Sequence, residues 1–343
     1  MTPPQQHDAQ GREPQGRDAF EPIFIVGCPR SGTTLLAAML DRHSLIAVPP
    51  ETLFFRDILP RLPRGATLHE TLVTGFMNGQ TTAHLHLERD VLEARFRRYA
   101  PDAPHLLRAV LEEYAARQGK LRPAEKTPVH LHYVPLILRW YPRAKVICLV
   151  RDGRDVALSM MRVPWAHDDL RLHSLMWNEC ARLALRFEKQ FPDRFLRLPF
   201  EALVNFPVES LQAVDSFVGV PFEARQLDIS IETAVVPEWE NDWKAKAKSA
   251  PDAARGGAWK RAATPSQKCL MNAAMRRFLR RLGYRETTLR NCPAAQRAAL
   301  RLTTAMWSLP VRVRVSLLQP RLHNLLYRWR RGLARIGFDF DRV

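Results

Sequence analysis

Short hydrophobic runs separated by longer amphipathic stretches dominate the chain and predict strands that alternate with helices. Four runs of β-branched, aromatic and aliphatic residues have the length of buried strands, namely 23–26, 46–48, 146–150 and 195–198. Helical spacing is found in the segments 33–40, 126–141, 156–162 and 172–189. This alternation favours an α/β fold with a parallel, P-loop-like sheet flanked by helices, which binds ligands beyond the carboxyl ends of its strands.

Three regions depart from this alternation. Residues 53–122 are mostly helical in pattern and predict a helical insertion. Residues 1–19 are polar and rich in Pro, Gln and Gly, which predicts a disordered tail. Residues 290–343 predict a basic helical extension, so that residues 20–289 are expected to form one core domain.

The segment Ile23–Thr34, IFIVGCPRSGTT, has the spacing of a P-loop, in which a glycine-bracketed loop leads from a buried strand into a helix. Its backbone N–H groups are expected to converge on an anion at the helix N-terminus, where the helix dipole favours negative charge. A nucleotide-hydrolysing P-loop carries Lys after its last glycine, but Thr33 stands there. The cation is Arg30, inside the loop, and its forked guanidinium suits an oxyanion.

A second anion site is predicted after the strand VICLV, residues 146–150. In an NTPase such a strand ends in an Asp that holds magnesium, whereas this one leads into Arg151. A helical stretch follows and carries the hydroxyl of Ser159. Two anion sites without a metal-binding carboxylate indicate a ligand with two separate charged groups, not a magnesium triphosphate.

At these residues the chain resembles the sulfotransferases that use 3′-phosphoadenosine 5′-phosphosulfate (PAPS), most closely their tyrosylprotein and bacterial branch. PRSGTT is similar to the family's 5′-phosphosulfate loop, and RDGRDVALS to its 3′-phosphate motif. The resemblance implies that Arg151 and Ser159 bind the 3′-phosphate. It also implies a 5′-phosphosulfate site made of Pro29, Arg30, Ser31, Gly32, Thr33 and Thr34.

Further matches to this family extend the resemblance from about Phe20 to Tyr284. The match at Glu51-Thr52 implies Glu51 as the general base. The match at EKTP implies Lys126, together with Arg30, as the group that stabilises the transferring sulfuryl group.

Two matches are looser. In FLRLPFEALV, Phe200 stands where related enzymes often carry Tyr, so a hydroxyl contact to the adenosine is lost and stacking is what remains. The segment RGGAWKR is similar to the family's C-terminal cofactor loop and implies PAPS contacts from Arg255 and Lys260.

These residues together predict a PAPS-dependent sulfotransferase, in which an acceptor hydroxyl attacks sulfur in line and 3′,5′-ADP leaves. Carbohydrate, lipid, small-alcohol and peptide-tyrosine acceptors all satisfy the motifs, and residues 53–122 are expected to cap the acceptor site. A P-loop kinase or NTPase is disfavoured by Thr33 and Arg151. A binding protein for nucleic acid or anionic lipid is permitted by the charge but leaves both anion motifs unexplained, so no nucleic-acid partner is expected.

The net charge of +17 is concentrated near the end of the chain. Residues 290–343 hold eleven arginines, no lysine and two aspartates, a local net charge of +9. Within them, residues 318–336 place Leu, Ile and Trp side chains on one face of a helix and arginines on the other. Such a helix packs its apolar face on the core or on a second subunit of a homo-oligomer, or docks on an anionic membrane surface.

Cysteines and histidines give no sign of a disulfide framework or a metal site. The five cysteines are scattered, and their odd number and lack of a C-x-x-C pair favour a reducing cytoplasm. The pairs His84-x-His86 and His130-x-His132 lack a third ligand, so no metal ion is expected. No apolar run reaches the roughly 18 residues of a membrane span. A cytoplasmic protein, at most peripheral to a membrane, is therefore expected.

Overall fold

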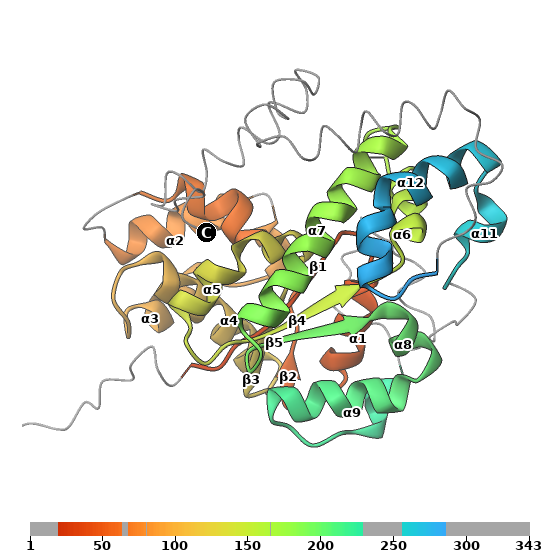
Figure 1. The fold of residues 1–343 in the computed structure, drawn as a ribbon. Helices are drawn as coiled ribbons and strands as arrows, with labels where there is room; N and C mark the ends of the chain where they lie inside the picture. The colour runs from red at the N-terminus through yellow and green to blue at the C-terminus, as the bar shows by residue number, and fades with distance from the viewer. Residues whose placement is uncertain (1–19, 64–67, 80, 165, 229–255, 286–343) are drawn as a thin grey trace, which may run out of the picture.

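The computed structural model describes residues 20–63, 68–79, 81–164, 166–228 and 256–285. The predicted tail 1–19 and the predicted extension 290–343, including its stretch 318–336, lie outside the described residues. Figure 1 shows the described part as a twisted sheet with helices on both sides.

Five parallel strands form the sheet, in the order β2-β3-β1-β4-β5. They are β1 (Ile23–Gly27), β2 (Ile46–Ala47), β3 (Arg122–Lys126), β4 (Lys145–Val150) and β5 (Phe195–Pro199). The central strand is β1, with Ile23 opposite Ala124 of β3 on one side and Lys145 of β4 on the other. Since the strand order reverses at β1, the carboxyl ends of β1 and β4 flank the crevice in which parallel α/β sheets bind ligands. The predicted fold class is confirmed.

The helices fall into two sets along the chain. Up to β3 they are α1 (Thr33–Asp41), the π-helix η2 (Phe54–Ile58), the 3-10 helix η3 (Leu59–Arg61), α2 (His69–Met77), the 3-10 helix η4 (Thr82–Leu85), α3 (Arg89–Phe96) and α4 (Ala103–Arg117). After β3 they are the 3-10 helix η5 (Pro128–Tyr133), α5 (Val134–Trp140), α6 (Gly153–Met160), α7 (Leu170–Gln190), α8 (Phe200–Asn205), α9 (Pro207–Val218), the 3-10 helix η6 (Ala224–Leu227), α11 (Trp259–Ala262) and α12 (Pro265–Arg281).

Both faces of the sheet are buried, which explains why its central strands are continuous hydrophobic runs. Side chains alternate across a strand, so Ile23 and Ile25 belong to one core with residues of α1 and α9. Phe24 and Val26 belong to the other core, together with residues of α4, α5 and α7. Figure 1 shows α9 and α7 on opposite sides of the sheet.

Strand β3 corrects the prediction of a helix over 126–141. The structure ends β3 at Lys126 and begins helical structure only at Pro128. The strand sequence RPAEK contains no hydrophobic run and therefore gives no periodic signal. Its backbone pairs with β1 on one side and β2 on the other, so tertiary pairing overrides its weak strand propensity.

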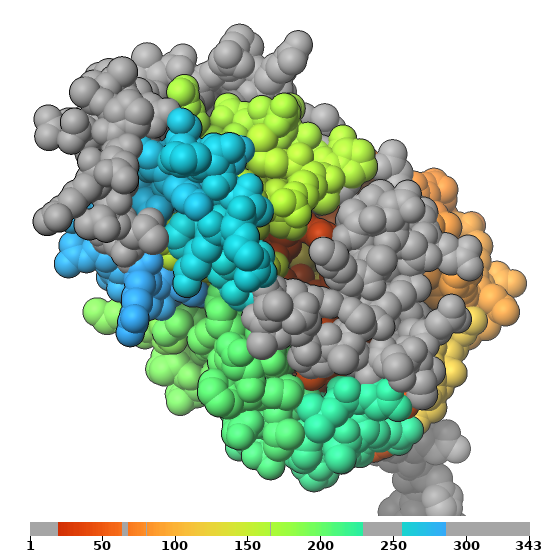
Figure 2. Space-filling model, turned by 90° about the vertical axis from the view of Figure 1, so that its right-hand side faces the viewer, coloured from red at the N-terminus to blue at the C-terminus, as the bar shows by residue number. Residues whose placement is uncertain are grey.

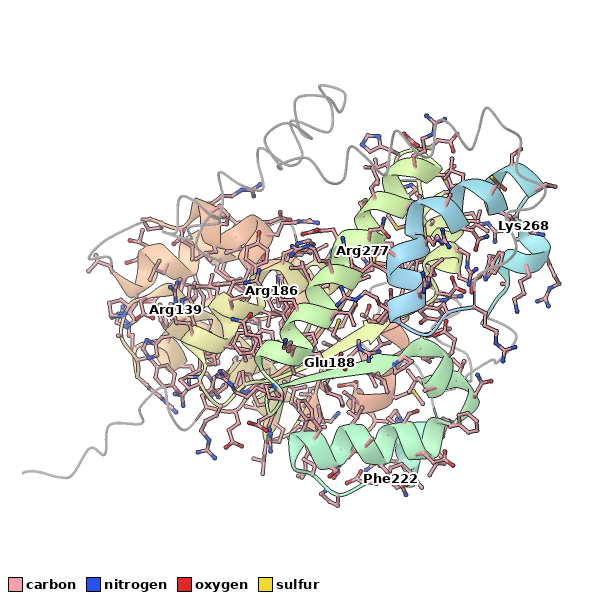
Figure 3. The ribbon with its side chains drawn as sticks, in the orientation of Figure 1. Arg139, Arg186, Glu188, Phe222, Lys268 and Arg277 are labelled. Atoms are coloured by element: carbon pink, nitrogen blue, oxygen red, sulfur yellow. The ribbon has the colours of Figure 1, made fainter. Side chains whose placement is uncertain are left out.

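Helix α7 joins the sheet to the C-terminal part of the described chain. Arg197 of β5 donates from Nε to both carboxylate oxygens of Glu188 on α7, at 3.0 and 2.9 Å; Figure 3 labels Glu188 beside β5. Asn178 of α7 donates to the carbonyl of Ala274 in α12, at 2.9 Å.

Cys269 of α12 is disulfide-bonded, which the scattered cysteines did not predict. None of the helices in the described ranges is long and apolar enough to cross a membrane.

Candidate functional site

The loop between β1 and α1 is a compact turn that contains two residues with positive φ, Arg30 and Gly32. The backbone N–H of Ser31 donates to the carbonyl of Cys28 at 3.1 Å, and Arg30 takes the left-handed conformation with φ 71°. Gly32 precedes α1 with φ 96°, and a Cβ there would lie 2.3 Å from the Phe200 ring. Glycine is therefore required at this position both by its backbone angle and by the space.

Ser31 provides an observation that fits an anion ligand. Its side chain is fully buried, and its hydroxyl oxygen has no hydrogen-bond partner among the described residues. A buried hydroxyl without a partner is costly, and this one lies beside the N-terminus of α1, which favours negative charge. Figure 2 shows red atoms of the N-terminal segment at the bottom of a hollow, beside the cyan atoms around α11.

The two predicted anion motifs meet at Arg30. Its Nε donates to Ser159 Oγ at 3.1 Å, although the two residues are far apart in sequence. Arg151, directly after β4, donates from Nη1 to the backbone carbonyl of Arg30 at 3.4 Å. The structure thus places the loop after β1 and the helix after β4 at one edge of the sheet, around a shared region of positive charge.

Phe200 lies under Arg151. The guanidinium carbon of Arg151 is 4.4 Å from the centroid of the Phe200 ring, within the range of a cation–π interaction. The ring is 2% exposed and closes against Gly32, so it forms the floor between the two motifs. Tyr284, which follows α12, donates its hydroxyl hydrogen to Glu201, the residue next to Phe200, at 2.9 Å. The chain therefore lacks a tyrosine at position 200 but has one from another segment close by.

The segment RGGAWKR is anchored to the second motif through Asp155. This carboxylate accepts the backbone N–H groups of Gly257 and Trp259, both at 2.7 Å. Burial raises the pKa of Asp155, against the opposing effects of Arg151 and of these two backbone donors. Lys260 follows on the surface and is exposed, whereas Arg255 lies outside the described residues.

Glu51 and Lys126 form an ion pair, with Nζ and Oε1 2.8 Å apart. The Lys126 side chain is fully buried, at the end of β3, and Glu51 follows β2 with 21% of its side chain exposed. Because β2 and β3 are parallel neighbours, their carboxyl ends bring these two residues together. Every predicted site residue that the structure describes therefore follows, or ends, a strand at the same edge of the sheet, except Ser159 and Lys260.

Glu125 is a site residue that the sequence analysis missed. Its carboxylate is fully buried and accepts hydrogen bonds from Thr52 Oγ1 at 2.8 Å, Thr127 Oγ1 at 2.5 Å and His130 Nδ1 at 2.9 Å. Burial raises the pKa of Glu125, but His130 and the hydrogen bonds from Thr127 and Thr52 outweigh this effect and hold the pKa below its usual value. The signal was present in EKTP, where a second charged residue precedes Lys126 in an otherwise buried segment.

The two histidine pairs do not share the face of a strand. His84 lies in η4, with His86 just after it, and His130 and His132 lie in η5. The described ranges contain no group of three or more His, Cys, Asp or Glu side chains arranged to hold a metal ion.

Comparison with known proteins identifies the family. A model described as "Sulfotransferase family" matches residues 22–224, more than half of the chain. The chain belongs to the sulfotransferase family. This membership also decides against the kinase or NTPase that Thr33 and Arg151 had disfavoured.

Two relatives and one solved structure illustrate the similarity. A putative protein-tyrosine sulfotransferase of Caenorhabditis briggsae is 29% identical over 212 residues, covering 60% of this chain and 68% of the relative. Protein-tyrosine sulfotransferase 2 of Gallus gallus is 27% identical over 215 residues, covering 58% and 51%. The sulfotransferase domain of the Synechococcus PCC 7002 olefin synthase has a TM-score of 0.59 at 22% identity and covers 81% of this chain and 99% of that domain, which shows a shared fold.

The matches cover the relatives unevenly. The chain spans 27% of one relative, an uncharacterized protein of Aquifex aeolicus, and 51% and 68% of the other two. Family membership is therefore established for the shared domain, while the acceptor and the donor are matters for proposal.

Proposed function

We propose that this protein transfers a sulfuryl group from PAPS to an acceptor hydroxyl and releases 3′,5′-ADP. The observation that carries the proposal is the hydrogen bond from Arg30 Nε to Ser159 Oγ, 3.1 Å long, because it brings two anion-binding motifs to one place. PAPS carries a 5′-phosphosulfate and a 3′-phosphate, which are two separate anionic groups on one small molecule. A ligand with a single triphosphate would leave one of the two motifs without a function.

The binding roles follow from position. The backbone N–H groups of residues 32–34, the Ser31 hydroxyl and Arg30 hold the 5′-phosphosulfate at the N-terminus of α1, in the loop that Pro29 begins. Arg151 and Ser159 hold the 3′-phosphate, and Phe200 supports Arg151 from below. Asp155 keeps the segment that leads into Lys260 against this site.

The chemical roles fall to the ion pair. Glu51 accepts the proton of the acceptor hydroxyl as the new oxygen–sulfur bond forms. Lys126 and Arg30 stabilise the negative charge that develops on the transferring group and on the leaving phosphate. Lys126 is fully buried, and a cation in a water-excluded site interacts more strongly with such charge than one in solvent.

The acceptor is a hydroxyl compound, and the names of the relatives favour a tyrosine side chain among the four classes of acceptor. Carbohydrate, lipid and small-alcohol hydroxyls satisfy the same residues. A cytoplasmic location, and the role of residues 318–336 in membrane docking or subunit packing, stay predictions from the sequence.

Titration with three ligands tests the proposal. We expect saturable binding of PAPS and 3′,5′-ADP without magnesium, and no comparable binding of ATP with magnesium or of a polyanion such as heparin. Incubation of a cell extract with labelled PAPS, followed by mass spectrometry of the sulfated products, then identifies the acceptor. Tight magnesium-dependent ATP binding, or binding of the polyanion alone, would contradict the proposed donor.

A further inference from the structure

Glu125 has no part in the chemistry described above, yet it is a fully buried carboxylate next to Lys126 in β3. It directly precedes Lys126 in β3, and it accepts a hydrogen bond from Thr52, the residue that follows Glu51. An ionised group is costly to bury unless its oxygens are satisfied. The three donors around Glu125, namely Thr52, Thr127 and His130, supply this compensation.

The same donors fasten the segment that follows Glu51. Thr52 Oγ1 also accepts the backbone N–H of Phe54 at 3.2 Å, and Thr127 Oγ1 accepts that of Leu53 at 3.4 Å. His130 Nε2 accepts the backbone N–H of Phe55, also at 3.4 Å. Each side chain that binds Glu125 therefore also holds one backbone group of residues 53–55.

This segment needs fastening, because its backbone is unusual. Leu53 has φ 50°, a left-handed conformation that costs energy for a residue with a Cβ. The π-helix η2 begins at the next residue, Phe54. Such backbone persists only when its surroundings over-determine it, and it occurs most often at functional sites.

The hydrogen-bond directions require an acceptor at position 125. Because the Phe55 N–H points at Nε2 of His130, the ring proton belongs on Nδ1, where it is donated to Glu125. An amide at position 125 cannot accept from Thr52, Thr127 and His130 together, because its oxygen and its NH2 group face opposite sides. Glu125→Gln therefore breaks the network while it keeps the volume of the side chain.

We infer that Glu125 is a positioning residue: its buried carboxylate connects β3 to residues 52–55 and thereby fixes the distance between Glu51 and Lys126. This inference rests on the proposed sulfuryl transfer. A displacement of about 1 Å at a reacting group can lower a rate by about a hundredfold, so the effect of losing Glu125 is on turnover and not on donor binding.

Four single variants test the role. Glu125→Gln replaces the carboxylate that accepts the hydrogen bonds, and Thr52→Val removes the hydroxyl that donates one of them. Thr52→Ser keeps a hydroxyl at position 52. Glu113→Gln is the matched control, since Glu113 of α4 is also buried but pairs with Arg95 of α3, outside the site. Turnover is measured as 3′,5′-ADP release from PAPS with p-cresol as probe acceptor, and with water where p-cresol is not accepted. Hydrogen exchange of the amides of residues 53–58 is measured in parallel.

We expect kcat to fall about 10- to 100-fold in Glu125→Gln and Thr52→Val, with the KM for PAPS and the affinity for 3′,5′-ADP within about twofold of the wild type. The double variant Glu125→Gln/Thr52→Val should lose little more turnover than either single variant, because both substitutions act on one hydrogen-bond network. Thr52→Ser should recover most of the turnover. Amides 53–58 should exchange faster in Glu125→Gln but not in Glu113→Gln.

Two results would count against the idea in different ways. Suppose that the wild type is active and that Glu125→Gln and Glu113→Gln, at equal folded fractions, have the same kcat. The positioning role is then wrong and the proposed function stands. If the wild type neither binds 3′,5′-ADP nor releases it from PAPS, the proposed function itself fails, and the positioning role with it.

Discussion

Arg30 Nε lies 3.1 Å from Ser159 Oγ, and this hydrogen bond joins the loop after β1 to the helix after β4. The two residues are brought together by the pairing of β1 with β4, which places Gly27 opposite Leu149. A ligand held by both motifs must therefore span a short distance and carry negative charge at both ends. This geometry gives separable predictions for the two ends of the ligand.

Arg151→Ala should weaken binding of 3′,5′-ADP much more than binding of adenosine 5′-phosphosulfate, which lacks a 3′-phosphate. A charge-assisted hydrogen bond lost from a partly buried site is worth ~1.5–3 kcal/mol, or roughly tenfold to a hundredfold in affinity. Isothermal titration calorimetry with both ligands measures the difference. Arg139→Ala on α5 is the control for loss of charge alone, and equal weakening of both ligands by Arg151→Ala would disprove the 3′-phosphate assignment.

Glu51→Gln should reduce kcat by about 10²–10⁴-fold and leave the affinity for 3′,5′-ADP nearly unchanged. The amide keeps an oxygen for Lys126 Nζ, which lies 2.8 Å from Glu51 Oε1 in the structure, but it cannot take up a proton. Asp57→Asn is a matched control, because Asp57 is a carboxylate in the following helix that pairs with Arg56. Near wild-type turnover in Glu51→Gln, with chemistry limiting the rate, would show that Glu51 is not the base.

Gly32→Ala should destabilise the fold more than Gly119→Ala, although both glycines have positive φ, 96° and 66°. The left-handed conformation alone costs about 1–2 kcal/mol for a residue with a Cβ. At Gly32 the added Cβ also lies 2.3 Å from the Phe200 ring, whereas at Gly119 nothing lies within 4 Å. Overpacking adds about 1–3 kcal/mol. Urea unfolding of the two variants measures the difference, and equal losses would show that Phe200 does not close on the loop.

Asp215→Asn should stabilise the fold more at neutral pH than in acid. Burial raises the pKa of Asp215 from 3.8 to about 6, against a hydrogen bond from Gln226 Nε2 and the attraction of His43. A carboxyl group with a raised folded-state pKa is favoured when protonated, so its ionisation destabilises the fold as pH rises from 3.8 to about 6.

The amide cannot ionise and so avoids this loss. The measurement is the urea midpoint of the wild type and of Asp215→Asn at about pH 4 and about pH 7.5. The midpoint of the variant should exceed that of the wild type by more at the higher pH than at the lower pH. A difference that is independent of pH would show that Asp215 titrates normally.

The sequence determined the central strands and the two anion motifs. Residues 23–26 and 146–150 are buried on both sides, so hydrophobicity alone marks them as strands, and the glycine spacing after the first of them marks the loop. Arg30 and Arg151 could be predicted as anion ligands because Arg30 lies in the loop after the first run and Arg151 directly follows the second, and parallel strands present their carboxyl ends at one edge. Local pattern and covalent spacing are enough for inferences of this kind.

Strand β3 and the site around it were decided by tertiary structure. RPAEK has no periodic pattern, so its strand arises only because β1 and β2 both offer backbone partners. Charged side chains are usually exposed, yet Glu125 and Lys126 are both fully buried, because Thr52, His130 and Glu51 satisfy their charges. The contact of Phe200 with Gly32 and Arg151 likewise joins three segments that are distant in sequence. Whether a charged side chain is buried depends on partners that are distant in sequence, and only the folded chain specifies where those partners are.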